Sequence, residues 1–539
     1  MTRPASRLVL DRRRFLSVAS AGFAVSGLGV VGLGVAGCGS SSSASSDSPG
    51  PDKLDYIKPG DPEVAAAESK RRYSGTTVPV ALSAGAATVD LGGRIVNTWA
   101  FGDKVVAPTI RMSAGDRLDA TLSNSLSADT SIHWHGVRIR NDMDGVPPVT
   151  QPAVVPGSAF DYTFIAPDPG TYWYHSHSGL QADRGLFGAL VVEDPQDSSG
   201  ADTDTVLVLD DWVDGLGTTP DALITALNPQ IAGGHGGHGA HGGASSTAAM
   251  PAGPTSEETA VAERLVSAGH GNSSALGGMT QHITYPMHLI NGRPSNDPSV
   301  IEAAPGTRLR IRIINAGAET PYRFAVAGHR LTVVAVDGYD VVPTDTDAIL
   351  IGMAQRYDVL ITVASGAWPV VASVEGRAGY ASTVLRSTDT TPLANPDVGG
   401  SIPELTRQLV LESELKAAES VRLDSRPPDR DYRVDLLQAG DRYVWAMAGP
   451  DAGELVMKQG ERVRITMTNT STMWHPMHTH GHTFAVPAYG GLRRDTVNVM
   501  PRTSLAIEFD ADNPGEWMFH CHNAYHFEAG MTANLKYIR

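Results

Sequence analysis

Residues 515–531 read GEWMFHCHNAYHFEAGM, in which His520, Cys521 and His522 are consecutive. Successive side chains of a β-strand point to opposite faces of its sheet, so the two imidazoles face one way and the thiol faces the other. One strand of this sequence can therefore serve two metal sites, and other parts of the chain must supply the remaining ligands of both.

The thiol side of this strand has a complete ligand set for a single copper ion. Cys521 is followed by His526 and Met531, and His475 lies upstream in the histidine-rich segment WHPMHTHGH. Two imidazoles, a thiolate and a weak thioether form the ligand pattern of a blue-copper electron-transfer site. The two histidines that flank the cysteine require a second cluster.

An internal repeat supplies the rest of that second cluster. GDRLDATLSNSLSADTSIHWHG begins at Gly115 and matches GERVRITMTNTSTMWHPMHTHG, which begins at Gly460; the first histidine of the HxH pair comes 18 residues later in both (133 − 115 and 478 − 460). PDPGTYWYHSH likewise matches ADNPGEWMFHCH, and the two HxH pairs of each copy start 42 residues apart (175 − 133 and 520 − 478). The two copies thus supply eight imidazoles, which suit three copper ions: His133, His135, His175, His177, His478, His480, His520 and His522.

The four motifs HWHG, HSH, HPxHxHGH and HCHxxxHxxxxM resemble those of the multicopper oxidases in the three-domain, laccase-like order, over roughly residues 72–539. The leader, NDMDG and YPMHLINGR resemble most closely the exported, copper-tolerance-associated multicopper oxidases of actinobacteria. The resemblance implies an all-β fold of three cupredoxin-like Greek-key β-sandwich domains, at 73–196, 197–400 and 401–539.

Length and patterning agree with three such domains. A chain of 539 residues fits three domains of about 150 residues each. Segments such as TVPVALSA and DRLDATLSN alternate polar and apolar residues between turn signals, as sandwich strands do. A third copy of the repeat begins at Gly306, but Phe324-Ala325-Val326 stands where the others have His-x-His. The middle domain is therefore predicted to be a spacer without copper.

Carried over residue by residue, the resemblance implies four copper ions. One type 1 copper would lie in the third domain, and one type 2 and two type 3 coppers would form a trinuclear cluster between the first and third domains. The type 1 ligands are His475, Cys521, His526 and Met531; the type 2 ligands are His133 and His478; the type 3 ligands are His135, His175 and His522 for one ion and His177, His480 and His520 for the other.

The resemblance also implies the reaction. A reductant gives up one electron at a time at the exposed edge of the type 1 site, where His475 or His526 is the expected port. The electron passes through Cys521 and its neighbours His520 and His522 to the cluster, where dioxygen takes up four electrons and becomes two waters.

Acidic residues bear on proton delivery. Asp144, in NDMDG, matches a residue that helps to protonate reduced oxygen in the family, a general-acid role, although Asp-Gly is also a strong turn pair. Phe527 follows the last type 1 histidine where several bacterial relatives have Glu, and Glu528, one place on, faces the other way on simple alternation. The resemblance therefore does not carry over the exit-side proton path.

Fewer residues indicate the reductant. Relatives that oxidise Cu(I) use Met and Asp near the type 1 copper; Met473 matches the Met and is equally compatible with core packing, whereas Ser471 replaces the Asp. The favoured function is oxidation of cuprous ion for copper detoxification, with phenols and amines as further reductants. The alternatives are a laccase that acts mainly on organic phenols, and a copper-binding or electron-transfer lipoprotein without turnover.

A glycine-rich stretch from about 215 to 279 is predicted to lack regular structure. It contains GGHGGHGAHGG, with His235, His238 and His241, which could collect substrate copper; the alternative is a solvated insertion with incidental metal affinity. The remaining histidines with no partner pattern are predicted to be structural: His270, His282, His288, His329 and His482.

Residues 1–37 are predicted to be a twin-arginine lipoprotein signal, because RRRFL is followed by an apolar, glycine-rich run and a lipobox-like VAGC that ends at Cys38. Lipid on Cys38 would anchor the exported protein to the outer face of the cytoplasmic membrane through a tether at 38–72. Within this tether, 61–72 is predicted to be a short helix with Asp61 as its N-cap.

Composition adds two constraints. The chain has two cysteines, Cys38 and Cys521, and neither is assigned to a disulfide because one ends the lipobox and the other lies between two histidines. The formal net charge is −16, and removal of a leader with five arginines and one aspartate makes it −20 (−16 − 4). Such acidity disfavours nucleic acid as a partner and attracts small cations.

Overall fold

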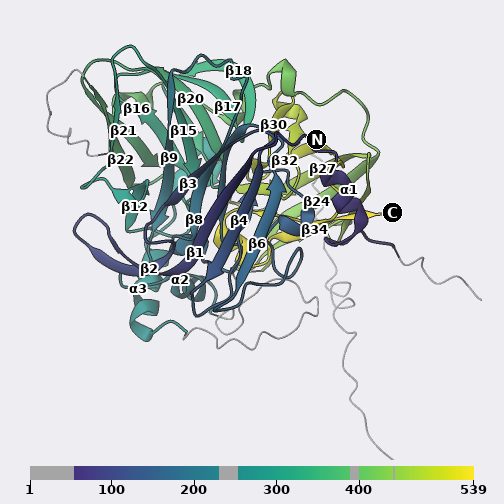
Figure 1. Cartoon of the computed structure of the whole chain (residues 1–539). Helices are drawn as coiled ribbons and strands as arrows, with labels where there is room; N and C mark the ends of the chain where they lie inside the picture. The colour runs from purple at the N-terminus through teal and green to yellow at the C-terminus, as the bar shows by residue number, and fades with distance from the viewer. Residues whose placement is uncertain (1–53, 230–252, 389–399, 441–442) are drawn as a thin grey trace, which may run out of the picture. The chain divides into compact units, whose positions relative to one another are not determined.

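Three successive pairs of β-sheets form most of the described chain, which comprises residues 54–229, 253–388, 400–440 and 443–539 of the computed structural model (Figure 1). The predicted all-β fold of three cupredoxin-like sandwiches is confirmed. The predicted leader, Cys38 and the three histidines of GGHGGHGAHGG lie outside the described residues.

The first sandwich shows why its segments are strands. Leu118, Ala120 and Leu122 alternate with more exposed residues in one strand, as a sheet with one face on a core requires. They share a hydrophobic core with Trp134 and Leu190 of the facing sheet. The sheets have the orders β2-β1-β4-β6 and β3-β8-β7-β5, with β1 (Thr77–Asp90), β2 (Ile95–Phe101), β3 (Ala107–Ser113), β4 (Arg117–Asn124), β5 (His133–His135), β6 (Ala159–Ile165), β7 (Gly170–His175) and β8 (Phe187–Glu193).

The middle sandwich is larger and carries no HxH pair on its strands. Its first sheet has the order β13-β12-β9-β15-β20-β17-β18, with β9 (Thr203–Trp212), β12 (Met287–Ile290), β13 (Arg293–Pro294), β15 (Arg308–Asn315), β17 (Leu331–Val336), β18 (Tyr339–Thr346) and β20 (Arg356–Thr362). Its second sheet has the order β14-β22-β21-β16-β19-β23, with β14 (Val300–Ala303), β16 (Tyr322–Val326), β19 (Ala348–Ile351), β21 (Ala367–Val374), β22 (Tyr380–Ser387) and β23 (Leu409–Val410). Strand β23 lies beyond residue 400, so the chain still contributes to this sandwich after the predicted end of the domain.

The third sandwich contains the cysteine. Its sheets have the orders β25-β24-β27-β32-β29-β30 and β26-β34-β33-β28-β31, with β24 (Arg430–Gln438), β25 (Trp445–Ala448), β26 (Leu455–Lys458), β27 (Arg462–Asn469), β28 (His475–Thr479), β29 (Phe484–Val486), β30 (Leu492–Arg494), β31 (Thr496–Val499), β32 (Ser504–Asp510), β33 (Glu516–Cys521) and β34 (Thr532–Ile538). Helix α4 (Ala524–Glu528) follows β33 directly.

One pairing recurs in all three sandwiches, as the internal repeat requires. Strand β1 pairs in parallel with β4, β9 with β15, and β24 with β27. The next strand of each copy (β5, β16 or β28) belongs to the other sheet. In β16, Phe324 and Val326 lie in the core of the middle sandwich. The third copy has therefore kept its strand and filled the position of the histidines with apolar side chains.

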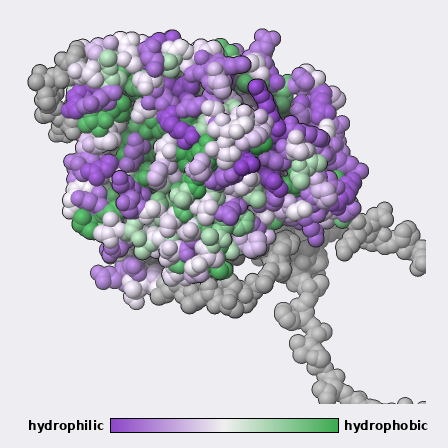
Figure 2. Space-filling view, in the orientation of Figure 1, coloured by the Kyte–Doolittle hydropathy of each residue, from purple (hydrophilic) through white to green (hydrophobic). Residues whose placement is uncertain are grey.

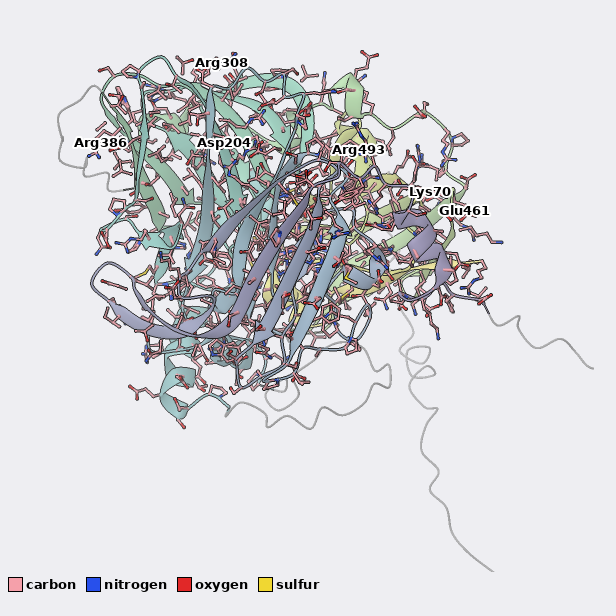
Figure 3. The ribbon with its side chains drawn as sticks, viewed as in Figure 1. Lys70, Asp204, Arg308, Arg386, Glu461 and Arg493 are labelled. Carbon is pink, nitrogen blue, oxygen red and sulfur yellow. The ribbon has the colours of Figure 1, made fainter. Side chains whose placement is uncertain are left out.

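Polar contacts join the first sandwich to its neighbours. Asp204, labelled in Figure 3, accepts hydrogen bonds from Arg111 of β3 at 2.7 Å and from Arg312 of β15 at 2.5 Å. At the seam with the third sandwich, the Asn141 side chain donates to the Glu516 carbonyl at 2.6 Å and accepts from the Glu516 N–H at 3.1 Å. The latter pair fixes the start of β33, the strand that carries the cysteine.

The helix before the first sandwich is shorter than predicted. Helix α1 spans Pro62–Glu68 and ends before Arg72, and Asp61 occupies the N-cap position without capping. The Asp61 carboxylate instead accepts hydrogen bonds from the Lys58 N–H at 2.9 Å and from Arg539 at 2.7 Å. The described part of the predicted tether is therefore bound to the end of the chain.

The prediction of an irregular segment from 215 to 279 is wrong at both of its ends. Helix α2 spans Pro220–Leu227 and helix α3 spans Ser256–Ser267, and a two-stranded sheet of β10 (Asn272–Ser273) and β11 (Gly278–Met279) follows. Each helix begins with a threonine whose side chain accepts from the backbone of the first turn. These local caps outweigh the glycine content on which the prediction relied.

Hydrophilic and hydrophobic residues are interspersed on the face shown in Figure 2. The strongly exposed large hydrophobic side chains of the described residues are separated along the chain: Leu54, Tyr73, Ile95, Val155 and Val342. Among the described helices, none combines the length and the apolar character that crossing a membrane requires.

Candidate metal centres

The equal spacing of the HxH pairs has a direct structural reason. In the first sandwich β5 pairs antiparallel with β7, so that His133 lies opposite His175. In the third sandwich β28 pairs antiparallel with β33, so that His478 lies opposite His520. The separation of 42 residues in each copy places two HxH pairs side by side on neighbouring strands.

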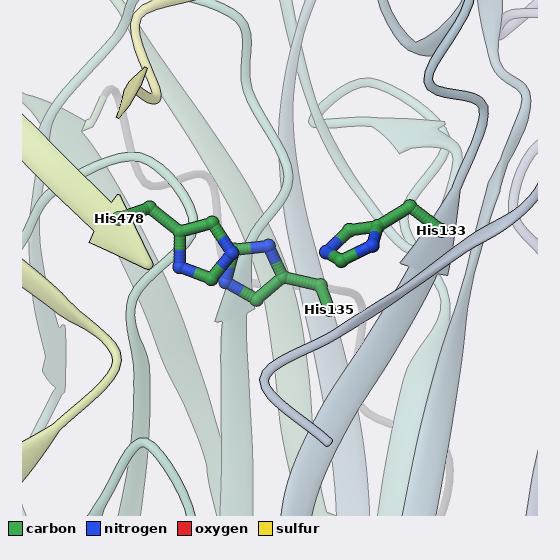
Figure 4. Close-up of side chains that lie close together, drawn as sticks. All are labelled: His133, His135 and His478. Atoms are coloured by element: carbon green, nitrogen blue, oxygen red, sulfur yellow. The ribbon is translucent and has the colours of Figure 1, made fainter. Parts of the chain in front are cut away.

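The histidines of the two sandwiches meet in compact groups. Figure 4 shows one group, in which the rings of His135 and His478 stack with centroids 3.9 Å apart beside His133. Within each group the possible ligand atoms lie within 4.8 Å of one another. Four of these groups contain predicted ligands alone: His133, His135 and His478; His135, His175 and His522; His177, His480 and His520; and His475, Cys521 and His526.

The thiol group lies on the reverse side of β33, as strand alternation predicts. Cys521 Sγ is 3.8 Å from His475 Nδ1 and 3.7 Å from His526 Nδ1, and these two nitrogens are 3.1 Å apart. Met531 is fully buried, and its carbonyl accepts a hydrogen bond from the Cys521 N–H at 3.1 Å. Burial raises the pKa of the Cys521 thiol, so a bound metal ion is needed to keep the thiolate form at neutral pH.

The imidazoles of the cluster are suited to bind metal. Burial is the largest cause that lowers the pKa values of His480, His520 and His522 well below the usual range, so these rings are neutral at pH 7. Nε2 of His480 and Nε2 of His520 are only 3.0 Å apart. Several further ring nitrogens are buried and have no hydrogen-bond partner: His133 Nε2, His135 Nδ1, His175 Nε2, His478 Nε2 and His522 Nε2. A set of converging, unpartnered nitrogen lone pairs fits copper ions.

Two aspartates orient the imidazoles through hydrogen bonds to their ring nitrogens. Nδ1 of His133 lies 2.9 Å from the Asp144 carbonyl, and Nδ1 of His480 lies 2.9 Å from the Asp144 carboxylate. Asp495 repeats the arrangement in the third sandwich, because its carbonyl is 2.9 Å from Nδ1 of His478 and its carboxylate is 3.2 Å from Nε2 of His135. Such partners of the outer nitrogen fix which nitrogen faces the metal.

Asp144 therefore lies where the sequence predicts an acidic group near the cluster, whereas Asp495 was missed. The spacing from the first histidine of each repeat is 11 residues for Asp144 and 17 for Asp495 (144 − 133 and 495 − 478), so alignment of the copies does not reveal it. Only a chemical argument could have pointed to Asp495: Nδ1 of His478 needs a hydrogen-bond acceptor, as Nδ1 of His133 does.

The expectation of an exposed type 1 edge is wrong, since His475 and His526 are both fully buried. Nε2 of His475 is 2.9 Å from Oγ of Ser471, whereas Nε2 of His526 has no hydrogen-bond partner. The two imidazoles are therefore not equivalent, and His526 is the one with an outer nitrogen left for a reductant.

His282 covers this site and is more than an isolated structural histidine. Its ring centroid lies 5.7 Å from that of His526 and 5.3 Å from that of the more exposed His270. Its Nδ1 is 3.1 Å from the buried carboxylate of Glu319, which also accepts from the backbone N–H of Ile283 at 2.8 Å. No motif identifies this pair, because the two residues come from different loops of the middle sandwich.

Met473 is fully buried in the core that includes Trp474 and Cys521, which favours the packing role that the sequence also allowed. His288 and His329 bond to protein groups of the middle sandwich, as expected of structural histidines. His482 bonds to the hydroxyl of Tyr537 at 2.7 Å and to the carbonyl of the predicted ligand His480 at 3.0 Å, so it supports the strand segment of that ligand.

Phe527 and Glu528 belong to a helix, so the alternation assumed for them does not apply. The Phe527 ring lies 4.6 Å from that of His520 and 5.3 Å from that of His177, beside the cluster. Glu528 is half-buried, with one carboxylate oxygen enclosed and without a hydrogen-bond partner, and burial raises the pKa of its carboxyl to about 7. The carboxyl of Glu528 thus lies close in sequence to the type 1 ligand His526. The side chain next to the histidine cluster, however, is the ring of Phe527.

Comparison with known proteins agrees with these sites. Models of the multicopper oxidase family match residues 84–197, 262–391 and 426–538. Multicopper oxidase MmcO of Mycobacterium tuberculosis is 40% identical over 481 residues, which cover 88% of this chain and 90% of that protein. Copper resistance protein A of Pseudomonas syringae pv. tomato is 26% identical and covers 84% of this chain and 92% of its own length.

Among solved structures, the laccase from Botrytis aclada superposes with a TM-score of 0.67 at 26% identity, over 87% of this chain and 89% of that one. Matched family models, a relative of 40% identity and the histidine and cysteine groups lead to one conclusion: the chain belongs to the multicopper oxidases, copper-dependent oxidoreductases that use dioxygen as electron acceptor.

Proposed function

We propose that the protein oxidises cuprous ion in copper detoxification, with four coppers that couple this oxidation to the four-electron reduction of dioxygen to water. The observation that carries the proposal is the convergence of eight imidazoles from the first and third sandwiches, with a thiol group behind one of their strands. The type 1 copper is assigned to His475, Cys521, His526 and Met531, the type 2 copper to His133 and His478, and the type 3 coppers to the remaining two histidine groups.

Copper in these groups supplies one-electron redox chemistry and dioxygen reduction. The chain contributes the geometry. Cys521 is bonded through the backbone to His520 and His522, so β33 gives a continuous covalent path from the thiol group to the cluster. Asp144 contacts His133 and His480 and is the candidate general acid.

The enclosure of the type 1 site favours a small reductant. His526 carries the free outer nitrogen, but it is fully buried beneath His282 and the ring of Trp445, whose centroid is 3.9 Å from that of His526. Neither type 1 histidine exposes any surface that a phenol ring could contact. A cuprous ion is much smaller and needs only a nearby side chain that can bind it. A relative by sequence is named copper resistance protein A, which supports the proposed role in copper detoxification.

A laccase that acts mainly on organic phenols is the second candidate, because the chain resembles the laccase from Botrytis aclada along most of its length. Membership of an oxidase family disfavours the third alternative, a copper-binding lipoprotein without turnover.

Export through the twin-arginine route and a lipid on Cys38 are part of the proposal, supported by the sequence of residues 1–38. A Cys38→Ser variant is expected to leave the membrane fraction of the native host; a variant that stays there would refute the anchor. The role of His235, His238 and His241 stays a prediction.

The decisive measurement is the copper content of the purified protein, together with kcat/KM for cuprous ion and for a dimethoxyphenol under oxygen. We expect about four coppers per chain, a blue protein and a preference for cuprous ion. A Cys521→Ser variant is expected to be soluble, colourless and inactive. One copper per chain would refute the four-copper site, and a large preference for the phenol would establish the laccase alternative.

A further inference from the structure

A buried ion pair between two sandwiches lies directly behind the histidine cluster. Arg356, the first residue of β20 in the middle sandwich, donates to both carboxylate oxygens of Asp495 in the third sandwich, at 2.8 and 2.5 Å. Both side chains are fully buried. The planar fork of an arginine matches a carboxylate in this two-bond geometry and fixes its orientation.

Asp495 is the residue that holds two of the predicted ligands. Its carboxylate oxygen at 3.2 Å from Nε2 of His135 is the same atom to which one Arg356 nitrogen donates at 2.8 Å. Its carbonyl accepts from Nδ1 of His478 at 2.9 Å, and the hydroxyl of Thr496 donates to the carboxylate at 2.8 Å. Any rotation of the Asp495 side chain would therefore move the acceptor of His135.

Arg356 also contacts the first sandwich next to its ligands. Its Nε donates at 3.0 Å to the carbonyl of Thr171 in β7, the strand that ends at His175. Gly136, which follows His135, has a φ of 83°, and a Cβ there would lie 2.5 Å from an Arg356 nitrogen and 2.6 Å from an Asp495 oxygen. The glycine of HWHG thus leaves the space that the ion pair fills.

We propose that Arg356 is a positioning residue for the metal cluster: by holding Asp495 against His135 and His478, it makes retention of copper in the cluster depend on the docking of the middle sandwich. This inference rests on the proposed function, since it takes His135 and His478 as copper ligands. The middle sandwich then contributes to the metal site, although it supplies no ligand.

The expected size of the effect on copper affinity follows from the role of groups that hydrogen-bond to the outer nitrogen of a ligating imidazole. Loss of a group that orients a ligating imidazole weakens metal affinity by roughly 10–100-fold. The type 1 group should be unaffected, because Arg356 contacts the cluster side and His475, Cys521 and His526 form their own group. The expected signature is therefore loss of copper from the cluster in a protein that remains blue.

The test is an Arg356→Met variant, loaded with copper and then equilibrated against a series of chelator concentrations. Copper per chain is measured, and electron paramagnetic resonance separates the type 2 signal from the type 1 signal. Arg462→Met is the matched control: Arg462 is also buried and pairs with Asp510 at 2.9 Å, but contacts neither Asp495 nor the partners of Arg356. Arg356→Lys keeps the charge and removes the fork.

We expect Arg356→Met to lose copper from the cluster, measured as a lower copper content with the type 1 signal retained, at a roughly 10–100-fold lower chelator concentration than wild type, while Arg462→Met keeps it and Arg356→Lys falls between. If both methionine variants behave alike, whether they lose or keep the copper, the inference is overturned. If Arg356→Met does not fold, Arg356→Lys decides, and retention equal to wild type refutes the positioning role. A wild-type protein that lacks a type 2 signal would instead refute the proposed function.

Discussion

The groups that orient the candidate metal ligands come from segments far apart in the chain. Arg356 of the middle sandwich holds Asp495 of the third, and His282 of the middle sandwich lies over His526 of the third. His133 and His478 could be predicted from the sequence, because both copies of the repeat place a histidine at the same distance from a glycine. Asp495, Arg356 and His282 have no such regular spacing, since only the fold brings their segments together.

At the residue scale, buried neutral histidines make stability depend on pH. Burial lowers the pKa of His288 to about 3, whereas an unfolded histidine titrates near pH 6.5. Between these values the unfolded chain binds more protons, so stability is lost as the pH falls below about 6.5. His288 alone should lower the unfolding free energy of the copper-free protein by about 2 kcal/mol between pH 7 and pH 5.

A His288→Gln variant tests this, with denaturant unfolding at both pH values. We expect the variant to lose about 2 kcal/mol less than wild type on acidification, although it is less stable at pH 7 because the bond to Tyr322 at 2.8 Å is altered. An unchanged difference between the two pH values would show that His288 is accessible or already charged.

At the scale of elements, strands were easier to predict than helices. Alternating patterns predicted strands, and the repeat with its 42-residue spacing predicted that the HxH pairs come together; the pairing of β5 with β7 and of β28 with β33 is how the structure brings them together. Helix α3 was missed although Thr255 and Glu258 form a capping box, a signal that the surrounding glycines obscured. Helix α4 was taken as a continued strand, but Asn523 caps it and ends the alternation after His522.

A testable prediction at the scale of elements concerns the turn that contains Gly145, in the segment that follows β5. Gly145 has a φ of 82°, and a Cβ there would lie 1.7 Å from the carbonyl oxygen of Ile132, the residue before His133. Gly145→Ala should destabilise the protein by about 3 kcal/mol or more and reduce its copper content. Gly157 is the control, since its φ is 77° with nothing within 4 Å, and alanine there should cost about 1–2 kcal/mol.

Unfolding free energy and copper per chain are measured for both glycine variants. If Gly145→Ala were no worse than Gly157→Ala, the close approach of this turn to the strand of His133 would be without consequence for the site.

At the scale of the whole molecule, the length and the repeat predicted three sandwiches, and the structure shows how the strands of each are arranged. The seams could not be predicted, because Asn141 pairs with Glu516 across 375 residues of sequence and Arg111 pairs with Asp204 across 93. Net charge is a property of this scale that the sequence does establish, at −16 for the full chain.

Such a charge should steer a cationic reductant. The Debye length falls from about 30 Å at 0.01 M salt to about 8 Å at 0.15 M, which screens the attraction. We expect kcat/KM for cuprous ion to fall several-fold over this range in a salt of weakly coordinating anions, and kcat/KM for a neutral phenol to stay constant. Equal salt dependence of the two reductants would contradict electrostatic steering.

The placement of His133 and His478 on different sandwiches has a mechanical consequence. An ion that both residues ligate closes a loop of 345 residues (478 − 133) without any covalent cross-link. Binding of that ion then stabilises the seam between the first and third sandwiches. A chelator that removes the ion is therefore expected to weaken the contact between these two sandwiches.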